Sequence, residues 1–347
     1  MAGAHGRRRR VALPWPVRLR LCVFEAAIDA TQRRDGSVNR FLFSLFDRRA
    51  PGRPAAGRRR RQLDGHYRRR FARPLGARFL LAVRGRRAPS SSTSHGGGFT
   101  LFSAASRAYD ALCRTLCAVV VSVDYRLAPE HRAPAAYDDG EAVLRYLGAT
   151  GLPDHVGPVD VSTCFVVGDS AGGNIAHHVA QRWTATATTT TTTTDNPVVH
   201  LAGVILIQPC FSGEERTESE RALDGVAPVL NTRRSDLSWK AFLPEGADRN
   251  HPAAHVVTGD DDDDAELHEA FPPAMVVVGG LDPLQDWDRR YAAMLRRKGK
   301  AARVVEFPEA IHSFYFFPEF LADDHRKLVG EIRAFVEECI TSKQPTA

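Results

Sequence analysis

The chain has 347 residues, 43% hydrophobic and 25% charged, which is typical of a globular protein and excludes a disordered or fibrous one. It contains no run of 18 or more apolar residues, so no membrane-spanning helix is predicted. A basic cluster at 7–10 precedes an apolar stretch, but Arg18, Arg20 and Glu25 interrupt that stretch and no convincing cleavage pattern follows. We therefore expect a cytoplasmic protein, with the nucleus and the oligomeric state left open.

The net charge of +6 is concentrated in one segment. Residues 53–88 contain 13 arginines and a single acidic residue, Asp64. The rest of the chain has 34 basic and 40 acidic side chains and is net negative. Because the basic segment lacks aromatic interleaving and any recognisable binding motif, we expect no nucleic-acid partner.

Apolar runs and helical periodicities alternate along the chain after one strand-like run at 79–83. Continuous apolar runs rich in β-branched residues predict buried strands at 118–123, 164–167, 204–207, 275–278 and 304–307. Apolar residues at helical spacing predict helices at 135–147, 171–183, 286–298 and 323–339. This alternation predicts an α/β fold with a mostly parallel sheet flanked by helices.

Three segments interrupt the alternation. Nine of the eleven residues 184–194 are Thr, which predicts a solvated loop. The acidic run at 260–264 is better explained by a solvated loop than by a cation site. Residues 211–270 are poor in strand patterns, and we predict that they form a cap insertion.

The pattern G-x-S-x-G at 168–172 lies between a predicted strand and a predicted helix. A nucleophilic serine on such a sharp turn needs small flanking residues, because its strained backbone brings neighbouring chains close. Ser170 is therefore the candidate nucleophile, with Asp169 as a supporting residue of the motif. The backbone N–H of Ala171 is a candidate donor to the oxyanion of a tetrahedral intermediate.

A second glycine motif, His95-Gly96-Gly97-Gly98, begins 75 residues before the candidate nucleophile. Glycine peptides expose their N–H groups without obstruction, so Gly96, Gly97 and Gly98 are further candidate donors to the oxyanion. His95 is a supporting residue of this motif. The alternative explanation is a flexible glycine linker after a serine-rich stretch.

A triad in this kind of fold follows the chain order serine, acid, histidine. Asp282 follows a predicted strand and two glycines, and His312 follows the next predicted strand. Asp286 and Asp288 compete for the acid role, but they fall in the following helix. We predict that Ser170, Asp282 and His312 act together, without a metal or an organic cofactor. The six cysteines are scattered and complete no zinc site.

These motifs resemble the hormone-sensitive-lipase-like group of α/β-hydrolases, and more narrowly the plant carboxylesterase family that also gave rise to the gibberellin receptors. The matching stretches are HGGGF at 95–99, DYRLAPEH at 124–131, GDSAGGN at 168–174 and LDP at 281–283. Residues 13–16 and 34–40 are similar to the family's N-terminal lid, and 213–218 to its cap. The resemblance implies a lid segment at 1–52 and an α/β-hydrolase domain at 95–340 with the cap insertion at about 211–270.

Residues 53–94 match no pattern of this family. Directly before His95, where the family has a buried apolar strand, the chain reads APSSSTS at 88–94. Hydroxyl groups in an apolar interior need partners, and the nearby arginines have only Asp64 to pair with. We therefore expect irregular backbone before His95. We interpret 53–94 as coding sequence read out of frame, with a divergent insertion as the alternative.

The resemblance implies hydrolysis of small carboxylic esters, with a small-molecule ester as the partner. The alternative is a binding protein resembling the gibberellin receptors. Those receptors have lost the triad histidine and carry Ser in place of the third glycine of the glycine motif. Because this chain retains His312 and Gly98, an enzyme is the favoured interpretation.

Overall fold

The computed structural model describes residues 13–50, 62–63, 76–81, 88–116, 119–151, 159–189, 199–257, 267–318 and 321–342. Its strands are Gln62–Leu63 (β1), Gly76–Leu81 (β2), Ala88–Ser94 (β3), Val119–Asp124 (β4), Val159–Asp169 (β5), Leu201–Ile207 (β6), Ala274–Leu281 (β7) and Ala302–Ile311 (β8). Its helices are Trp15–Thr31 (α1), Arg40–Ser44 (α2), Arg107–Thr115 (α3), Ala135–Thr150 (α4), Ala171–Thr189 (α5), Glu218–Leu223 (α6), Thr232–Phe242 (α7), Gln285–Arg297 (α8), Ala322–Thr341 (α9) and the short 3-10 helix Phe314–Phe316 (η2).

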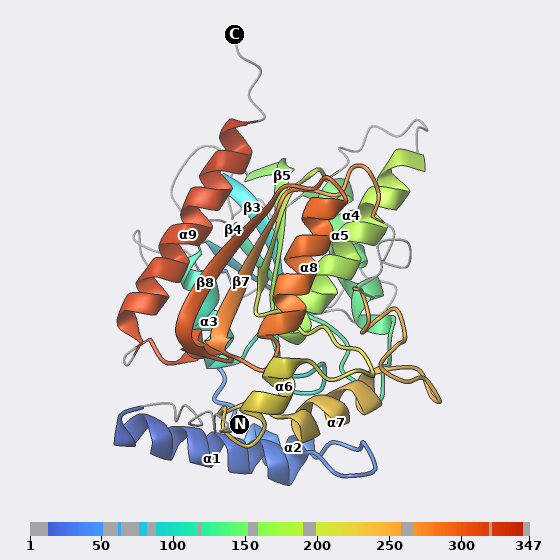
Figure 1. Cartoon of the computed structure of the whole chain (residues 1–347). Helices are drawn as coiled ribbons and strands as arrows, with labels where there is room; N and C mark the ends of the chain where they lie inside the picture. Colours follow the sequence, from blue (N-terminus) through green and yellow to red (C-terminus); the bar gives the residue numbers. More distant parts are fainter. Residues whose placement is uncertain are drawn as a thin grey trace, which may run out of the picture.

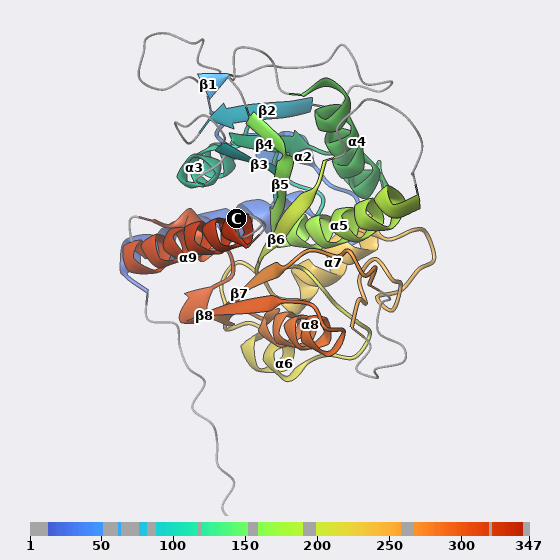
Figure 2. The same cartoon turned by 90° about the horizontal axis from the view of Figure 1, so that it is seen from above.

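The strands form one eight-stranded sheet in the order β1-β2-β4-β3-β5-β6-β7-β8, which can be followed in Figure 2. Neighbouring strands from β4 to β8 are parallel, whereas β2 is antiparallel to β4 and β1 is antiparallel to β2. Helices α3 and α9 cover one face of the sheet, and α4, α5 and α8 cover the other. The predicted α/β fold with a mostly parallel sheet flanked by helices is confirmed.

Helices α1, α2, α6 and α7 lie together across the end of the sheet where the parallel strands finish (Figure 1). The segment predicted as a cap, 211–270, contributes α6 and α7 and no strand in its described part. Among the described residues, none of the helices has the length and apolarity needed to cross a bilayer.

The structure tests part of one of the two predictions about low-complexity segments and none of the other. Helix α5 continues to Thr189, so the loop predicted at 184–194 is wrong in its first half. Threonine can be accommodated in a helix because its hydroxyl donates a hydrogen bond to a carbonyl of the preceding turn, as Thr184 Oγ1 does to Ala180 O at 2.9 Å. Residues 190–194 and the acidic run at 260–264 lie outside the described residues.

Residues 88–94 form β3 in the middle of the sheet, so the irregular backbone that we predicted before His95 is wrong. This strand pairs in parallel with β4 on one side and with β5 on the other. Ser90, Ser91, Ser92, Thr93 and Ser94 are each at most 4% exposed. Backbone pairing on both sides satisfies the peptide groups of β3, and the neighbouring strands supply the apolar side chains. Apart from β1, β2 and β3, residues 53–94 lie outside the described part of the chain.

The serine-rich strand nevertheless leaves polar atoms without partners. The hydroxyl groups of Ser91 and Thr93 are buried and have no hydrogen-bond partner within the described residues. Ser91 faces a void of about 10 Å³ with an otherwise mostly apolar lining that includes Phe165 and Ile205. A buried polar group without a partner costs about 1–3 kcal/mol. Strand β3 is therefore held by its position between β4 and β5 and not by its own side chains.

The isosteric substitution Thr93→Val should increase the free energy of unfolding by about 1–2 kcal/mol, because it replaces an unpaired hydroxyl by a methyl group. Thr31→Val is the matched control: Thr31 is also fully buried, but its Oγ1 donates to Ala27 O at 2.7 Å. The control should not gain stability. Urea unfolding measures both variants, and a Thr93→Val protein less stable than the parent would contradict this account of β3.

Candidate active site

The turn between β5 and α5 places one side chain, that of Ser170, at the carboxyl edge of the sheet. Ser170 has φ of +50°, a left-handed conformation that non-glycine residues seldom adopt. A Cβ atom at Gly168 would lie 1.9 Å from Gly172 O, and one at Gly172 would lie 2.0 Å from Ser94 O. Both flanking glycines are thus required by close backbone approaches, as the motif predicted.

The three predicted triad residues meet at this edge. His312 Nε2 and Ser170 Oγ are 3.0 Å apart, and His312 Nδ1 is 2.7 Å from Asp282 Oδ2. Ser170 follows β5, Asp282 follows β7 and His312 follows β8, so three strand ends converge on one point. All three side chains are buried, and Asp282 is fully enclosed.

The surroundings of the acidic residues separate Asp282 from its competitors. The second oxygen of Asp282, Oδ1, accepts the Leu284 N–H at 3.0 Å, so the carboxylate is fixed from both sides. Asp286 Oδ2 instead accepts the Ser219 N–H at 2.8 Å. Asp288 is buried, neither of its oxygens has a partner within the described residues, and burial raises its pKa well above the usual range. This surrounding disfavours the ionised form of Asp288.

Gln208 is a site residue that the sequence analysis missed. It is buried directly after β6, with φ of +47°. Its Nε2 donates to Ile311 O at 3.1 Å and its Oε1 accepts the Ser313 N–H at 2.8 Å, so it fixes the backbone on both sides of His312. The only indication in the sequence was that Gln208 is a polar residue directly after an apolar run, a position comparable to that from which Asp282 was predicted.

The glycine loop lies against the nucleophile. Gly97 and Gly98 have φ of +101° and +58°, and both line a cavity of about 70 Å³ together with Ser170 and His312. No acceptor for the N–H groups of Gly97 and Gly98 is found among the described residues. The N–H of Gly96, in contrast, donates to Asp169 Oδ1 at 3.1 Å. Gly96 is therefore engaged in holding the loop, unlike the two glycines that follow it.

Asp169 joins the glycine loop to the nucleophile turn. Its Oδ2 accepts two tyrosine hydroxyls, Tyr109 at 2.9 Å and Tyr315 at 2.7 Å, while Oδ1 accepts Gly96 N–H. Burial raises the pKa of Asp169 to about 6, although these hydrogen bonds favour the ionised form. This carboxylate therefore fastens three separate segments at a cost in desolvation.

His95 supports the same loop without reaching the nucleophile. Its ring is stacked on Tyr125 with the centroids 4.3 Å apart, and the Tyr125 hydroxyl donates to His95 O at 2.7 Å. Burial lowers the pKa of His95, so the ring is neutral at physiological pH. His95 is a packing residue of the loop.

The lid and the cap close the cavity over the triad. Phe24 and Ile28 of α1 line it from the lid, and Ser238 of α7 lines it from the cap. The buried Arg234 of α7 joins the two: its Nη2 and Asp29 Oδ2 of α1 are 2.7 Å apart. The hydrogen bond from Arg234 holds the pKa of Asp29 below its usual range.

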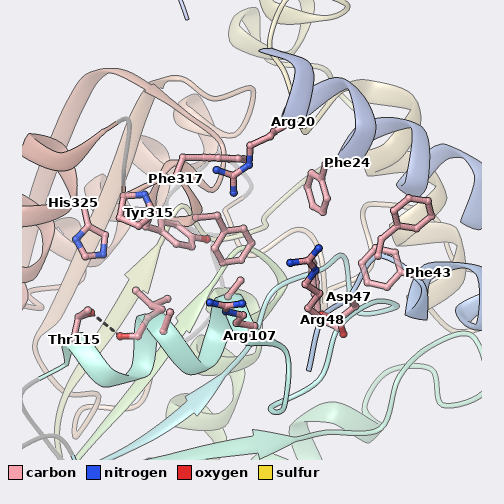
Figure 3. Close-up of a pocket in the computed structure, with 17 residues that line it drawn as sticks. Arg20, Phe24, Phe43, Asp47, Arg48, Arg107, Thr115, Tyr315, Phe317 and His325 are labelled. Carbon is pink, nitrogen blue, oxygen red and sulfur yellow. Dashed lines mark hydrogen bonds between the residues drawn. The ribbon is translucent and has the colours of Figure 1, made fainter. Parts of the chain in front are cut away.

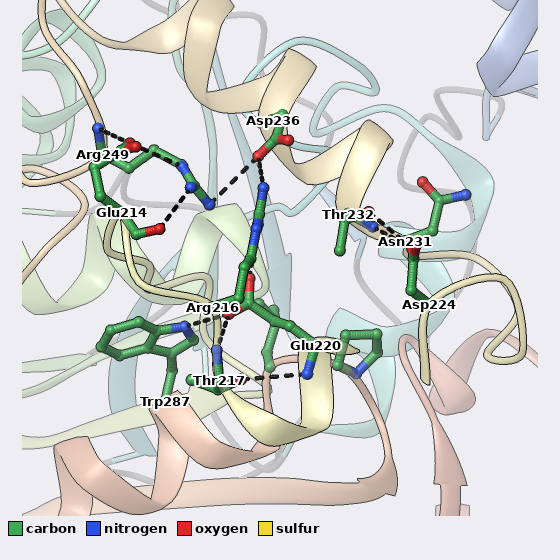
Figure 4. A network of polar contacts seen from close by, with 12 residues as sticks. Glu214, Arg216, Thr217, Glu220, Asp224, Asn231, Thr232, Asp236, Arg249 and Trp287 are labelled. Atoms are coloured by element: carbon green, nitrogen blue, oxygen red, sulfur yellow. Dashed lines mark hydrogen bonds and ion pairs between the residues drawn. The ribbon is translucent and has the colours of Figure 1, made fainter. Parts of the chain in front are cut away.

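A network of charged residues fixes the cap to the body of the domain (Figure 4). Arg216 binds Glu220 at 2.9 Å and also pairs with Asp236, which connects α6 with α7. Arg249 pairs with Asp236 at 3.4 Å, and Trp287 Nε1 of α8 donates to Glu220 Oε2 at 3.2 Å. The stretch at 213–218 that resembles the family's cap thus supplies Arg216, which links the two cap helices. No group of three or more His, Cys, Asp or Glu side chains able to hold a metal ion is found in the described part.

A buried serine bonded to a histidine, itself bonded to an aspartate, at the ends of three parallel strands defines an α/β-hydrolase type of site. Residues 93–316 match the family model of the alpha/beta hydrolase fold, and the chain belongs to that family. It is 38% identical over 335 residues to the gibberellin receptor GID1C of Arabidopsis thaliana, covering 91% of this chain and 92% of the receptor.

Enzymes are also among the similar proteins. The 3-O-acetylpapaveroxine carboxylesterase CXE2 of Papaver somniferum is 33% identical over 255 residues, covering 70% of this chain and 77% of that protein. The structure of a hyperthermophilic esterase from the archaeon Pyrobaculum calidifontis superimposes with a TM-score of 0.69 at 26% identity, covering 94% of this chain and 98% of that one. The resemblance to plant carboxylesterases and gibberellin receptors is therefore confirmed.

The raised pKa of Asp169 predicts a pH-dependent stability. Its pKa of about 6 in the folded protein exceeds the reference value of 3.8, so ionisation costs stability as the pH rises through 6. Asp169→Asn cannot ionise and should gain stability relative to the parent between pH 4.5 and pH 8, by about 3 kcal/mol at most. Urea unfolding at both pH values measures this change.

Asp29→Asn is the control for this pH range. The pKa of Asp29 is lowered from 3.8, so its contribution to stability is present above the unfolded value and is lost only as the pH falls below it. Relative to the parent, the stability of this variant should stay nearly constant between pH 4.5 and pH 8. If Asp29→Asn gained as much stability over this range as Asp169→Asn, the assignment of the Asp169 carboxylate would be wrong.

Proposed function

We propose that the chain is a carboxylesterase that hydrolyses small carboxylic esters. The observation that carries the proposal is the continuous buried hydrogen-bond chain from Ser170 through His312 to Asp282. A serine hydroxyl is a weak nucleophile until an adjacent base takes its proton, and His312 Nε2 is at the right distance. The relatives that are carboxylesterases support the same reaction class.

Each triad residue has one role. Ser170 Oγ attacks the acyl carbon while His312 Nε2 accepts the hydroxyl proton. The bond from His312 Nδ1–H to Asp282 Oδ2 fixes the tautomer that leaves Nε2 free to accept, and the carboxylate stabilises the imidazolium. The imidazolium then protonates the leaving alkoxide, and a water activated by His312 hydrolyses the acyl-enzyme. Ser170 supplies the first attacking electron pair and the proton that reaches the alkoxide, and the water supplies the second attacking pair and the proton that restores the serine hydroxyl.

The oxyanion forms beside the glycine loop. We assign its donors to the backbone N–H groups of Gly97, Gly98 and Ala171, which surround Ser170. We assign Gly96 to positioning, because its N–H is already donated to Asp169. Asp169 itself is a positioning residue that keeps the loop at the correct distance from the nucleophile.

A second candidate function, small-molecule binding like that of the gibberellin receptors, is favoured by the outer surface of the lid. Large apolar side chains are exposed there, including Trp15 at 75% and Phe41 at 78%. This apolar surface continues along α1 and just beyond α2 with the exposed side chains of Leu19, Val23, Leu45 and Phe46. Exposed apolar surface of this extent indicates a partner. Because the bonded triad is complete, we rank hydrolysis first.

Ser170→Ala should abolish hydrolysis of short-chain p-nitrophenyl esters, with a loss on the order of 10⁶-fold in kcat. Intact mass should show one fluorophosphonate adduct on the parent chain and none on the variant. An unlabelled parent chain that unfolds cooperatively would overturn the esterase proposal.

A matched pair of carboxylate variants controls for general damage to the site. Asp282→Asn should lower kcat about 10⁴-fold, because the imidazole loses its orienting partner. Asp288→Asn removes a buried carboxyl that has no hydrogen-bond partner among the described residues, and should retain parental activity. Equal losses in both variants would contradict the assignment of the acid.

Isothermal titration with a bioactive gibberellin separates the two candidate functions. The retained His312 and its two hydrogen bonds support an enzyme, so we expect no sub-micromolar binding. The Ser170→Ala variant, which cannot turn over an ester, should be titrated in parallel. Sub-micromolar affinity in both proteins would establish the receptor-like function instead.

A further inference from the structure

A second and much larger cavity lies beside the triad cavity. Its volume is about 810 Å³, against about 70 Å³ in front of Ser170, and it opens between α1, α2, α3 and η2 (Figure 3). Phe24, Phe102 and Phe316 line both cavities and form the wall between them. The larger volume falls in the range of 300–1,000 Å³ that small-molecule sites occupy. Neither ester hydrolysis nor the sequence motifs assign it a role.

The wall and floor of the large cavity are aromatic. Phe43 meets Phe102 edge to face with the ring centroids 4.9 Å apart, and Phe316 meets Tyr109 in the same way at 5.1 Å. The ring centroids of Phe24 and Phe102 are 6.2 Å apart, so Phe24 continues the aromatic surface onto α1. Such a surface takes up the flat or alicyclic apolar body of a ligand.

The rim of the same cavity is cationic. Three arginines line this rim: Arg20 of α1, Arg48 in the segment after α2, and Arg107 of α3. Figure 3 shows their side chains directed toward the space between these elements. Arg48 and Arg107 have no carboxylate partner among the described residues, in contrast to arginines such as Arg40 and Arg114, which are in ion pairs. An unpaired guanidinium beside an apolar surface is suited to a carboxylate, which it can bind through two parallel hydrogen bonds.

The one acidic residue of the lining does not neutralise this rim. Asp47 Oδ2 accepts the Ser106 hydroxyl at 2.7 Å, and the carboxylate is not paired with Arg48 or Arg107. Burial also raises the pKa of Asp47. The cavity therefore combines an aromatic interior with a net positive rim.

We propose that this cavity is a binding site for an amphipathic carboxylate, separate from the site of ester hydrolysis. The apolar body of the ligand lies on Phe24, Phe43 and Phe102, and its carboxylate pairs with Arg48 and Arg107. A neutral molecule of the same shape leaves both guanidinium groups unpaired. The site therefore discriminates by charge as well as by shape.

Isothermal titration of the full chain with 2-naphthoate tests the proposal, with 2-naphthamide as the neutral probe of the same shape. We expect one naphthoate per chain and at least tenfold weaker binding of the amide. Arg48→Gln combined with Arg107→Gln should weaken naphthoate binding at least tenfold. Arg18→Gln is the matched control, since Arg18 is exposed on α1 but does not line the cavity.

A space-filling variant locates the bound ligand. Ala111 is an exposed residue of α3 that lines the large cavity and not the triad cavity. Ala111→Trp should abolish naphthoate binding and leave hydrolysis of p-nitrophenyl acetate unchanged. The proposal is overturned by equal affinity for acid and amide, by absence of naphthoate binding, or by full naphthoate affinity in Ala111→Trp. These outcomes do not depend on whether the chain is an esterase.

Discussion

The left-handed backbone of Ser170 is the constraint on which the rest of the site depends. It turns the chain from β5 into α5 within one residue, and this requires Gly168 and Gly172 to pass within contact distance of other backbone. The neighbour of Gly172 is the end of β3, at Ser94. The nucleophile turn therefore needs a strand beside β5 whose end runs directly into the glycine loop. This explains why β3 occupies the centre of the sheet despite its poor side chains.

The buried carboxylate of Asp169 lowers the stability of the fold but fixes the geometry of the glycine loop. The glycine loop, α3 and η2 come from distant parts of the chain, and one buried carboxylate beside the nucleophile accepts a hydrogen bond from each of them. Burying a neutral residue would cost less desolvation free energy than burying this carboxylate, as its raised pKa of about 6 indicates. A neutral amide, however, has one acceptor oxygen in place of two, and Asp169 uses both oxygens to accept three donors. The unpaired hydroxyls in β3 and the buried, unpaired carboxyl of Asp288 also reduce stability.

The sequence predicted those parts of the fold and site whose signals are local. Strands β4 to β8, helices α4, α5, α8 and α9, and the proximity of Ser170, His312 and Asp282 follow from apolar runs, glycine motifs and chain order. Strand β3 could not be predicted, because its stability comes from backbone bonds to β4 and β5 that leave no pattern in its own side chains. Gln208 and the partners Tyr109 and Tyr315 were missed for a related reason. Each acts through hydrogen bonds to residues far away in the sequence.

The lid determines what can reach Ser170. Phe24 and Ile28 on its inner side leave a cavity of about 70 Å³ in front of the nucleophile, which is below the volume of sites for drug-sized ligands. An ester with more than a few heavy atoms therefore reaches Ser170 only if the aromatic wall or α1 shifts. Helix α1 is held by apolar packing of the buried Val17, Leu21 and Ile28 as well as by polar contacts such as the pairing of Arg234 with Asp29. A shift of α1 therefore breaks contacts of both kinds, but it leaves the triad intact, because Ser170, Asp282 and His312 lie at the ends of β5, β7 and β8.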